Sequence, residues 1–357
     1  MKDLSVSHIE KKGSTKIVDR VDLKIHEGET VGLIGPTGTG KAVTAKAVLR
    51  LLEPFFSKKS EWEIDGEVFY RGRDLMGLSE DELRALRGKE LSIIFQNPPS
   101  SLNPILMIGQ QTGEPMEAHE EIEAQRLREL VIEYLGKVEL PDARRRSRFF
   151  RHQFSGGEAQ RIMIAMALIC GPSLLVADEP TSDLDVIVQR QVLELLKRIN
   201  EDFDISTLLI THDLGVIAEM SDHVYVMYAG RIIEHGDVKS IFKEPGHPYT
   251  RGLLRSIPRI DVDHFDFEGI PGETPQPPYD IPGCNFHPRC KHVEDQCSVE
   301  DPVLEEVKPN HHVACLRARE IYTRQRVAIM HLFLAQSRQA LLIDRSNSRV
   351  NARKCQF

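Results

Sequence analysis

The feature that most constrains this chain is a glycine-rich loop between an apolar segment and a helix-like one. Thr30–Ile34 is short, apolar and partly β-branched, which is typical of a buried strand, and Val43–Leu52 has helical character. The loop between them reads, in order, Gly35, Pro36, Thr37, Gly38, Thr39, Gly40 and Lys41. Its G-x-x-x-x-G-K pattern predicts a phosphate-binding loop, because glycines let backbone amides point at phosphate oxygens and the lysine reaches the β- and γ-phosphates.

The candidate phosphate site extends over Ala42 and Val43, where the helix begins. Ala42 stands where this pattern normally has a Ser or Thr whose hydroxyl ligates Mg²⁺. Taken alone, the incomplete pattern is equally compatible with a structural glycine-rich turn. Other segments of the chain therefore have to decide between the two.

Two carboxylates follow an apolar strand later in the chain. Leu174–Ala177 has the pattern of a buried strand, and Asp178 and Glu179 come directly after it. Beside a triphosphate, Asp178 would hold Mg²⁺ through its water shell and Glu179 would polarise the attacking water. A strand that ends in solvated acids has the same pattern, but the position of the pair roughly 140 residues after a phosphate loop favours the catalytic interpretation.

A double glycine marks the start of another predicted helix. Ser155 and Glu158 have the spacing of a capping box, and Gly156 and Gly157 lie between them. Capping alone explains the outer two residues. Two glycines weaken a helix and leave its first amides open to an anion, so they indicate a ligand.

In this order the segments resemble the nucleotide-binding domain of ABC transporters across roughly residues 1–245. Three more residues match motifs of that family, namely Gln96 of the Q-loop, Asp185 of the D-loop and the switch residue His212. The resemblance implies an α/β fold, an ABC-type P-loop nucleotide-binding domain with a helical subdomain. It also implies ATP and Mg²⁺ as ligands.

The same resemblance implies a role for each matching residue. Glu179 and His212 would act on the γ-phosphate, and Gln96 would report to membrane subunits. Two such domains sandwich ATP in this family, so Ser155 and Gly157 would face nucleotide held by the phosphate loop of a partner.

A narrower resemblance, over residues 1 to about 318, is to the oligopeptide/dipeptide (and nickel) importers. It rests on Ile94–Pro98, Ser101–Pro104, His247–Thr250 and a cysteine-bearing C-terminal region. This resemblance implies an importer ATPase for peptides or a related small solute, at the cytoplasmic face of the membrane. The implied partners are a second ATPase subunit, two membrane-spanning permease subunits and, indirectly, an extracytoplasmic solute-binding protein.

Three departures from the family pattern predict a weakened nucleotide site on this chain's own loop. Ala42 lacks the hydroxyl, and Thr44 is out of register to replace it. Glu158 stands where many signatures have Gln, and Glu10–Lys16 lacks the adenine-stacking aromatic residue expected upstream of the loop. A non-hydrolysing regulatory subunit and a soluble ABC ATPase outside transport therefore remain alternatives, although Glu179 and His212 oppose the first of them.

Four of the six cysteines lie close together in the sequence, and we expect them to hold a metal. They are Cys284, Cys290, Cys297 and Cys315. Their spacing is wider than the tight pairs of zinc sites and favours a 4Fe-4S cluster, with zinc and unligated thiols as alternatives. His311 and His312, close to the last cysteine, are interpreted as surface or outer groups rather than ligands.

Composition and charge limit the other functional classes. A net charge of −8 argues against nucleic-acid binding. The longest apolar run, around Ile162–Cys170, is shorter than the roughly 20 residues of a membrane-spanning helix, and no apolar signal-peptide core follows the N-terminus. We expect a nucleotide-binding domain over residues 1–245, a loop-rich linker and metal-cluster module over 246–320, and a basic amphipathic tail over 321–357. We also interpret Arg144–Arg151 as a solvated basic face.

Overall fold

The computed structural model describes residues 1–10, 13–52, 61–96, 101–256 and 269–321. The Asn97–Pro98 part of the importer pattern and, apart from Ile321, the predicted tail lie outside these ranges. The strands are β1 (Lys2–Glu10), β2 (Gly13–Val21), β3 (Thr30–Ile34), β4 (Trp62–Glu67), β5 (Phe69–Tyr70), β6 (Arg73–Asp74), β7 (Leu91–Ile94), β8 (Leu174–Asp178), β9 (Ser206–Thr211), β10 (His223–Tyr228), β11 (Arg231–Asp237), β12 (Glu305–Lys308) and β13 (His311–Val313). The helices are α1 (Lys41–Val48), α2 (Glu80–Leu86), α4 (Ile108–His119), α5 (Ala124–Lys137), α6 (Ala143–Arg146), α7 (Gly156–Leu168), α8 (Val186–Phe203), α9 (Leu214–Met220), α10 (Val238–Lys243) and α11 (Pro248–Arg255), with 3₁₀ turns η1 (Arg151–Gln153), η2 (His287–Arg289) and η3 (Asp295–Ser298).

An eight-stranded sheet forms the centre, in the order β12-β13-β11-β10-β3-β9-β8-β7. The five strands from β10 to β7 run parallel to one another, and β11, β13 and β12 continue the sheet with antiparallel pairing. The predicted strands are present at β3 and β8, and both are apolar because helices cover them on two faces. The carboxyl ends of β3, β8 and β9 therefore meet at one edge, where ligands bind in open α/β sheets.

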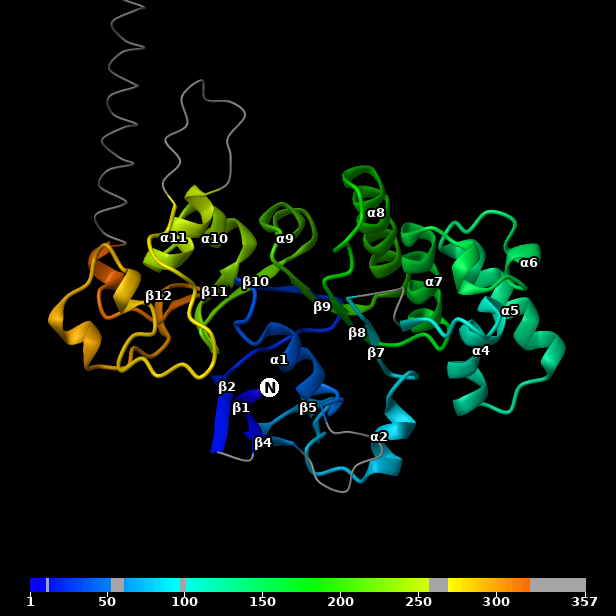
Figure 1. Cartoon of the computed structure of the whole chain (residues 1–357), viewed down its shortest axis with the longest axis horizontal. Helices are drawn as coiled ribbons and strands as arrows, with labels where there is room; N and C mark the ends of the chain where they lie inside the picture. The colour runs from blue at the N-terminus through cyan, green and yellow to red at the C-terminus, as the bar shows by residue number, and fades with distance from the viewer. Residues whose placement is uncertain (11–12, 53–60, 97–100, 257–268, 322–357) are drawn as a thin grey trace, which may run out of the picture.

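Helix α1 is buried between this sheet and a second one. The second sheet is antiparallel, with the order β2-β1-β4, and its apolar residues share a core with α1 and β3. Figure 1 shows α1 above these N-terminal strands. The helix begins at Lys41, two residues before the predicted start, because Gly40 in the left-handed region (φ 99°) ends the loop there.

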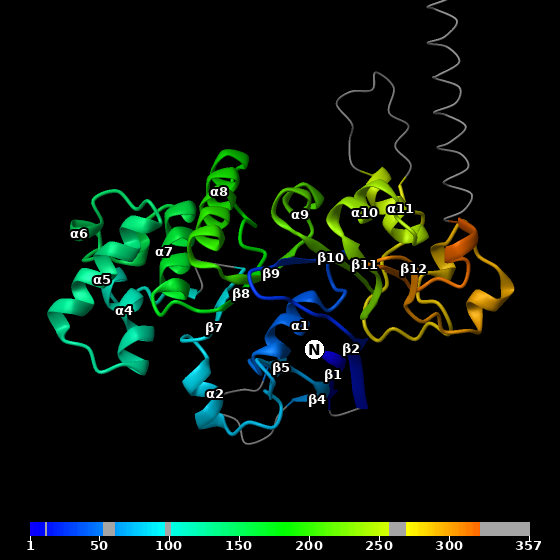
Figure 2. The same ribbon diagram turned by 180° about the vertical axis from the view of Figure 1, so that it is seen from behind.

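A group of helices extends the molecule beyond β7, which is plain in both Figure 1 and Figure 2. Helices α4, α5 and α7 pack around a separate apolar core that includes Leu135, Ile162 and Ile164. Helix α7 leads from this group back to β8. The predicted helical subdomain corresponds to this part of the chain.

The C-terminal region packs against the central sheet instead of following it as a separate linker. Gly246 and His247, at the start of the predicted loop-rich region, lie outside regular structure, and His247 accepts a hydrogen bond from the Tyr249 amide and caps α11. Glu234, fully buried on β11, accepts hydrogen bonds from the amides of Gly246 and His247 and fixes that turn. Strands β12 and β13 then add to β11.

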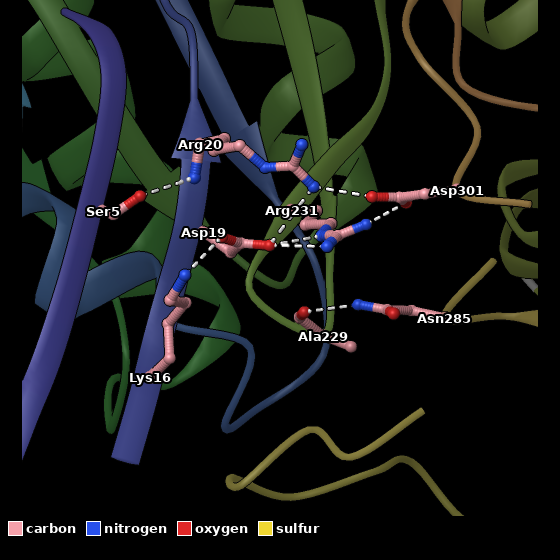
Figure 3. A network of polar contacts seen from close by, with 8 residues as sticks. All are labelled: Ser5, Lys16, Asp19, Arg20, Ala229, Arg231, Asn285 and Asp301. Carbon is pink, nitrogen blue, oxygen red and sulfur yellow. Dashed lines mark hydrogen bonds and ion pairs between the residues drawn. The ribbon is translucent and has the colours of Figure 1, made fainter. Parts of the chain in front are cut away.

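A polar network joins this region to the N-terminal sheet (Figure 3). Asp301 pairs with Arg20 of β2 and with Arg231 of β11. Arg231 also donates through Nε to Asp19 at 2.7 Å. Asn285 donates to the carbonyl of the turn between β10 and β11 at 2.9 Å. The C-terminal region is thus held on β2 and on β11.

None of the helices in the described ranges is both long and apolar enough to cross a bilayer.

Candidate functional site: a phosphate loop opposite a carboxylate pair

The glycine-rich loop curls around the side chain of Lys41. The ammonium Nζ donates to the carbonyls of Gly35 and Pro36 at 2.8 and 3.0 Å. Burial lowers the pKa of Lys41, and the charges of Glu179 and Asp178 oppose that shift. The loop therefore presents a largely buried cation that is in electrostatic contact with both predicted carboxylates.

The side chain of Ala42 is a methyl group, so this residue supplies no side-chain oxygen to the site. Ala42 is among the residues that line the cavity in front of the loop. Thr44 is fully buried, and its hydroxyl donates to the Gly40 carbonyl at 3.0 Å. The geometry agrees with the prediction that Thr44 does not replace the missing hydroxyl.

Glu179 is the point where three segments of the chain meet. Gln96 Nε2 donates to Glu179 Oε2 at 3.1 Å, and His212 Nδ1 lies 3.2 Å from Glu179 Oε1. The Ser182 hydroxyl lies 3.1 and 3.0 Å from the carbonyls of Gln96 and Glu179. Asp178 is 3% exposed at the end of β8, and burial raises its pKa. Two of the residues predicted to be catalytic, Gln96 and His212, therefore contact the carboxylate of the third, Glu179.

The loop and the carboxylates line one open cavity of about 730 Å³. The predicted residues on its wall are Thr37, Gly38, Gly40, Lys41, Ala42, Val43, Gln96, Asp178, Glu179 and His212. A cavity of this size is within the range of small-molecule and cofactor sites. Its cation, carboxylates and open helix start are the groups that a magnesium–nucleoside triphosphate requires.

The double-glycine segment lies elsewhere. Ser155 and Glu158 form the predicted capping box at the start of α7, but neither residue lines the cavity. Glu158 Oε1 accepts a hydrogen bond from Arg146 at 2.7 Å, and this lowers the pKa of Glu158 to about 2. The solvated-face prediction was therefore wrong for Arg146, whose side chain is only 14% exposed. Asp185 caps α8 through the amides of Ile187 and Val188.

Comparisons with known proteins identify this combination of loop, carboxylates and signature helix. Residues 18–182 match the ABC transporter family, and residues 233–297 match the family described as oligopeptide/dipeptide transporter, C-terminal region. The dipeptide transport ATP-binding protein DppD of Bacillus subtilis is 42% identical over 315 residues, covering 88% of this chain and 93% of DppD. A Brucella ovis protein described as a peptide import ATP-binding protein is also 42% identical, covering 85% of this chain and 92% of that protein.

This chain belongs to the family of ABC transporter ATP-binding proteins. The fold agrees with the ATP-binding cassette MJ0796, solved as a dimer in a post-hydrolysis state with ADP and Pi, at a TM-score of 0.58 and 26% identity. That match covers 66% of this chain and 97% of the cassette. The chain is accordingly an ABC-type ATPase, and the predicted P-loop α/β fold is confirmed.

Some residues of the ABC site were not selected from the sequence. Ser182 lies three residues before Asp185 of the D-loop, and its hydroxyl links the carbonyls of Gln96 and Glu179. Ile17 and Pro277 also line the cavity, although one comes from β2 and the other from the C-terminal region. An apolar residue in a strand and a proline in a loop carry no sequence signal for nucleotide binding, so only the fold could reveal them.

The four clustered cysteines converge in space. Cys284, Cys290, Cys297 and Cys315 line one small pocket, and none of them forms a disulfide. Burial and the neighbouring thiols raise the pKa of Cys284 to about 11 and that of Cys315 to about 12. Even so, within the described ranges no group of three or more His, Cys, Asp or Glu residues has an arrangement that could hold a metal ion.

The two histidines near the last cysteine differ in how far they are buried. His311 is fully buried, and its Nε2 lies 2.7 Å from Glu234 Oε1. The ring of His312 stacks on that of His235 with centroids 4.5 Å apart. The surface interpretation was wrong for His311, because pairing of β13 with β11 buries its side chain in the extended sheet, whereas His312 is half-buried.

Proposed function

We propose that this chain is the ATP-hydrolysing subunit of an ABC importer for peptides or a related small solute. The observation that carries the proposal is the arrangement around Glu179, where Gln96 and His212 contact the two oxygens of one carboxylate on the cavity that also contains Lys41. A carboxylate fixed in this way can orient a water for in-line attack on the γ-phosphate. The peptide and dipeptide descriptions of the relatives support the cargo class.

ATP would be enclosed between two such subunits. The signature residues Ser155 and Gly157 do not line this chain's own cavity, which leaves them available to nucleotide on another subunit. The cassette MJ0796 is a dimer in its solved structure, which supports the same arrangement here. We propose a second ATPase subunit as the partner, with closing and opening of the pair driving two membrane-spanning permease subunits at the cytoplasmic face of the membrane. An extracytoplasmic solute-binding protein would deliver the cargo.

Mg²⁺ would lack one protein ligand at this site, namely the Ser or Thr hydroxyl that the phosphate-loop pattern normally supplies at the position of Ala42. Asp178 is positioned to hold it, whereas Ala42 offers no ligand and the Thr44 hydroxyl is turned toward Gly40. We therefore propose that the site on this loop turns over more slowly than the site that its signature segment completes on the partner. Bound Mg²⁺ supplies neutralisation of charge on the phosphates, and Lys41 adds a second, fixed cation.

A test of hydrolysis uses Glu179→Gln in the assembled complex. The amide keeps the size of the side chain but cannot act as a base, so phosphate release by this site should fall about 100-fold or more while ATP still binds. ATPase rate and ATP affinity are measured on the same preparation. The matched control is Glu194→Gln, an exposed change on α8, which should alter neither.

A complex whose rate is unchanged by Glu179→Gln would support the alternative of a non-hydrolysing regulatory subunit, because the partner site would then supply all turnover. Purification without permease subunits would instead favour an ABC ATPase outside transport.

We also propose that the four cysteines hold a 4Fe-4S cluster with a structural role. Four free thiols around one pocket match the ligand set of such a cluster, which is larger than a single ion. Anaerobically purified protein should then contain iron and sulfide with a broad visible absorption band, and Cys290→Ser should reduce the band. Zinc without iron would contradict this proposal, and Cys170→Ser, outside the pocket, serves as the control.

A further inference from the structure

A segment of the C-terminal region, residues 270–281, lies against the phosphate loop, and we call it the strap. The Tyr279 hydroxyl donates a hydrogen bond to the Gly38 carbonyl. The carboxamide of Gln276 lies so close to Gly38 that a β-carbon there would collide with it. Pro277, between these two residues, lines the nucleotide cavity. Figures 1 and 2 both show this segment, in yellow, beside β2 and β11.

The strap is fixed at both ends. At its start, Arg289 donates to the carbonyls of Pro271 and Gly272 at 2.7 and 2.9 Å. At its end, the ring of Tyr279 packs on Gly230, where a β-carbon would lie 3.0 Å from the ring. Arg289 directly precedes Cys290, so the cysteine pocket and the strap share one support. The polar network of Figure 3 holds the same region on β2 and β11.

We infer that the strap is part of the nucleotide site and that Pro277 contacts the nucleoside end of bound ATP. The inference rests on the assignment of ATP to the phosphate loop. Glu10–Lys16, upstream of the loop, contains no aromatic residue to stack on a base. Ile17 and Pro277 bring apolar side chains to the cavity from outside the phosphate loop and the carboxylate strands. A planar base gains most from apolar surfaces of this kind, whereas the charged groups of the site serve the phosphates.

Tyr279 has a different role, as a positioning residue for the loop. In a trans peptide the carbonyl and the next amide point in opposite directions. A Gly38 carbonyl bonded to Tyr279 therefore directs the Thr39 amide away from the strap. Gly38 has φ +85°, which glycine adopts without strain, and its lack of a side chain leaves room for Gln276.

The test compares ATP with inorganic tripolyphosphate, which has the phosphates and no nucleoside. Pro277→Ala in the full-length chain removes apolar contact surface, so the dissociation constant for ATP should rise about fivefold while that for tripolyphosphate stays the same. Pro275→Ala is the matched control, because it makes the same change in the strap at a residue that does not line the cavity. Thermal unfolding without ligand should be equal for the two variants, which separates binding from folding.

Tyr279→Phe keeps the ring and removes the hydrogen bond to Gly38. It should therefore raise the dissociation constants for ATP and for tripolyphosphate by the same factor. Equal affinities of Pro277→Ala and Pro275→Ala for ATP would overturn the inference and leave the phosphate site intact. Equal dissociation constants of the unchanged chain for ATP and tripolyphosphate would also overturn the inference, because the nucleoside would then add nothing to binding. Binding of neither ligand would overturn the nucleotide site itself and the inference with it.

Discussion

Lys41 and Asp178 illustrate how burial changes the charge balance of single residues at this site. Burial lowers the pKa of Lys41 and raises that of Asp178. In the absence of a ligand, burial therefore destabilises both the protonated ammonium and the ionised carboxylate. A magnesium–triphosphate supplies the missing opposite charges to both. The free energy of nucleotide binding therefore includes relief of two desolvated charges, in addition to new hydrogen bonds.

Ala42→Ser should strengthen Mg²⁺ binding at this site. The added hydroxyl offers the hard oxygen ligand that Mg²⁺ prefers, so the Mg²⁺ concentration for half-maximal ATPase activity should fall about tenfold. Ala42→Cys is the control, since a thiol has nearly the same size but is a poor ligand for Mg²⁺. An equal effect of both substitutions, or no effect of serine, would show that the missing hydroxyl does not limit this site.

The contact between α7 and α8 shows how elements place the signature segment. Gly157 lies in the first turn of α7, where a β-carbon would overlap the Cγ1 atom of Val188 on α8. Glycine is therefore required for helix packing here, in addition to any role in binding phosphate. Asp185 caps α8, so the D-loop and the signature segment are fixed by one packed pair of helices.

Gly157→Ala should lower the free energy of unfolding by about 1–3 kcal/mol, because the new methyl group collides with a stiff β-branched side chain. Adding Val188→Ala should recover part of this loss, which a double-mutant cycle in urea would measure. Gly136→Ala is the matched control, since it lies on α5 with nothing within 4 Å of the added carbon. That change should stabilise the protein slightly. A purely additive cycle would contradict the proposed collision.

The C-terminal region extends the central sheet through β13 and β12, and histidines lie buried or half-buried where it joins. His235 on β11 stacks between Tyr225 and His312, with ring centroids 4.7 and 4.5 Å away. Burial, followed by the charges of neighbouring histidines, lowers the pKa of His235 to about 3. Protonation at this junction therefore opposes the attachment of β13.

Stability should fall as the pH is lowered from about 6.5 toward 3. His235 has its ordinary pKa of 6.5 in the unfolded chain and about 3 in the folded one, so the unfolded state binds more protons in this range. Between pH 7 and pH 5 the free energy of unfolding should fall by about 1–2 kcal/mol less in His235→Phe than in the unchanged protein, as measured by urea unfolding at both pH values. His152→Phe, at an exposed site, should leave the slope unchanged. An unchanged slope for His235→Phe would contradict this prediction.

The α/β fold and the positions of the phosphate loop and the carboxylate pair could be predicted because they depend on the local order of residues in the sequence. A strand, a glycine loop and a lysine fix the phosphate site, and a strand that ends in Asp178 and Glu179 brings its carboxylates to the same sheet edge, since parallel strands align their carboxyl ends. The capping box of Ser155 and Glu158 is local for the same reason.

Only the tertiary structure decided what surrounds these groups. Thr44 turns its hydroxyl to its own helix, Gln96 and His212 meet on Glu179, and the strap places Pro277 at the nucleotide cavity. Each of these contacts joins residues through three-dimensional packing, and apolar or backbone contacts between distant segments leave no fixed spacing in the sequence. The sequence by itself therefore determined that the chain has a phosphate loop and a strand that ends in two carboxylates. The fold decided which further residues complete the site.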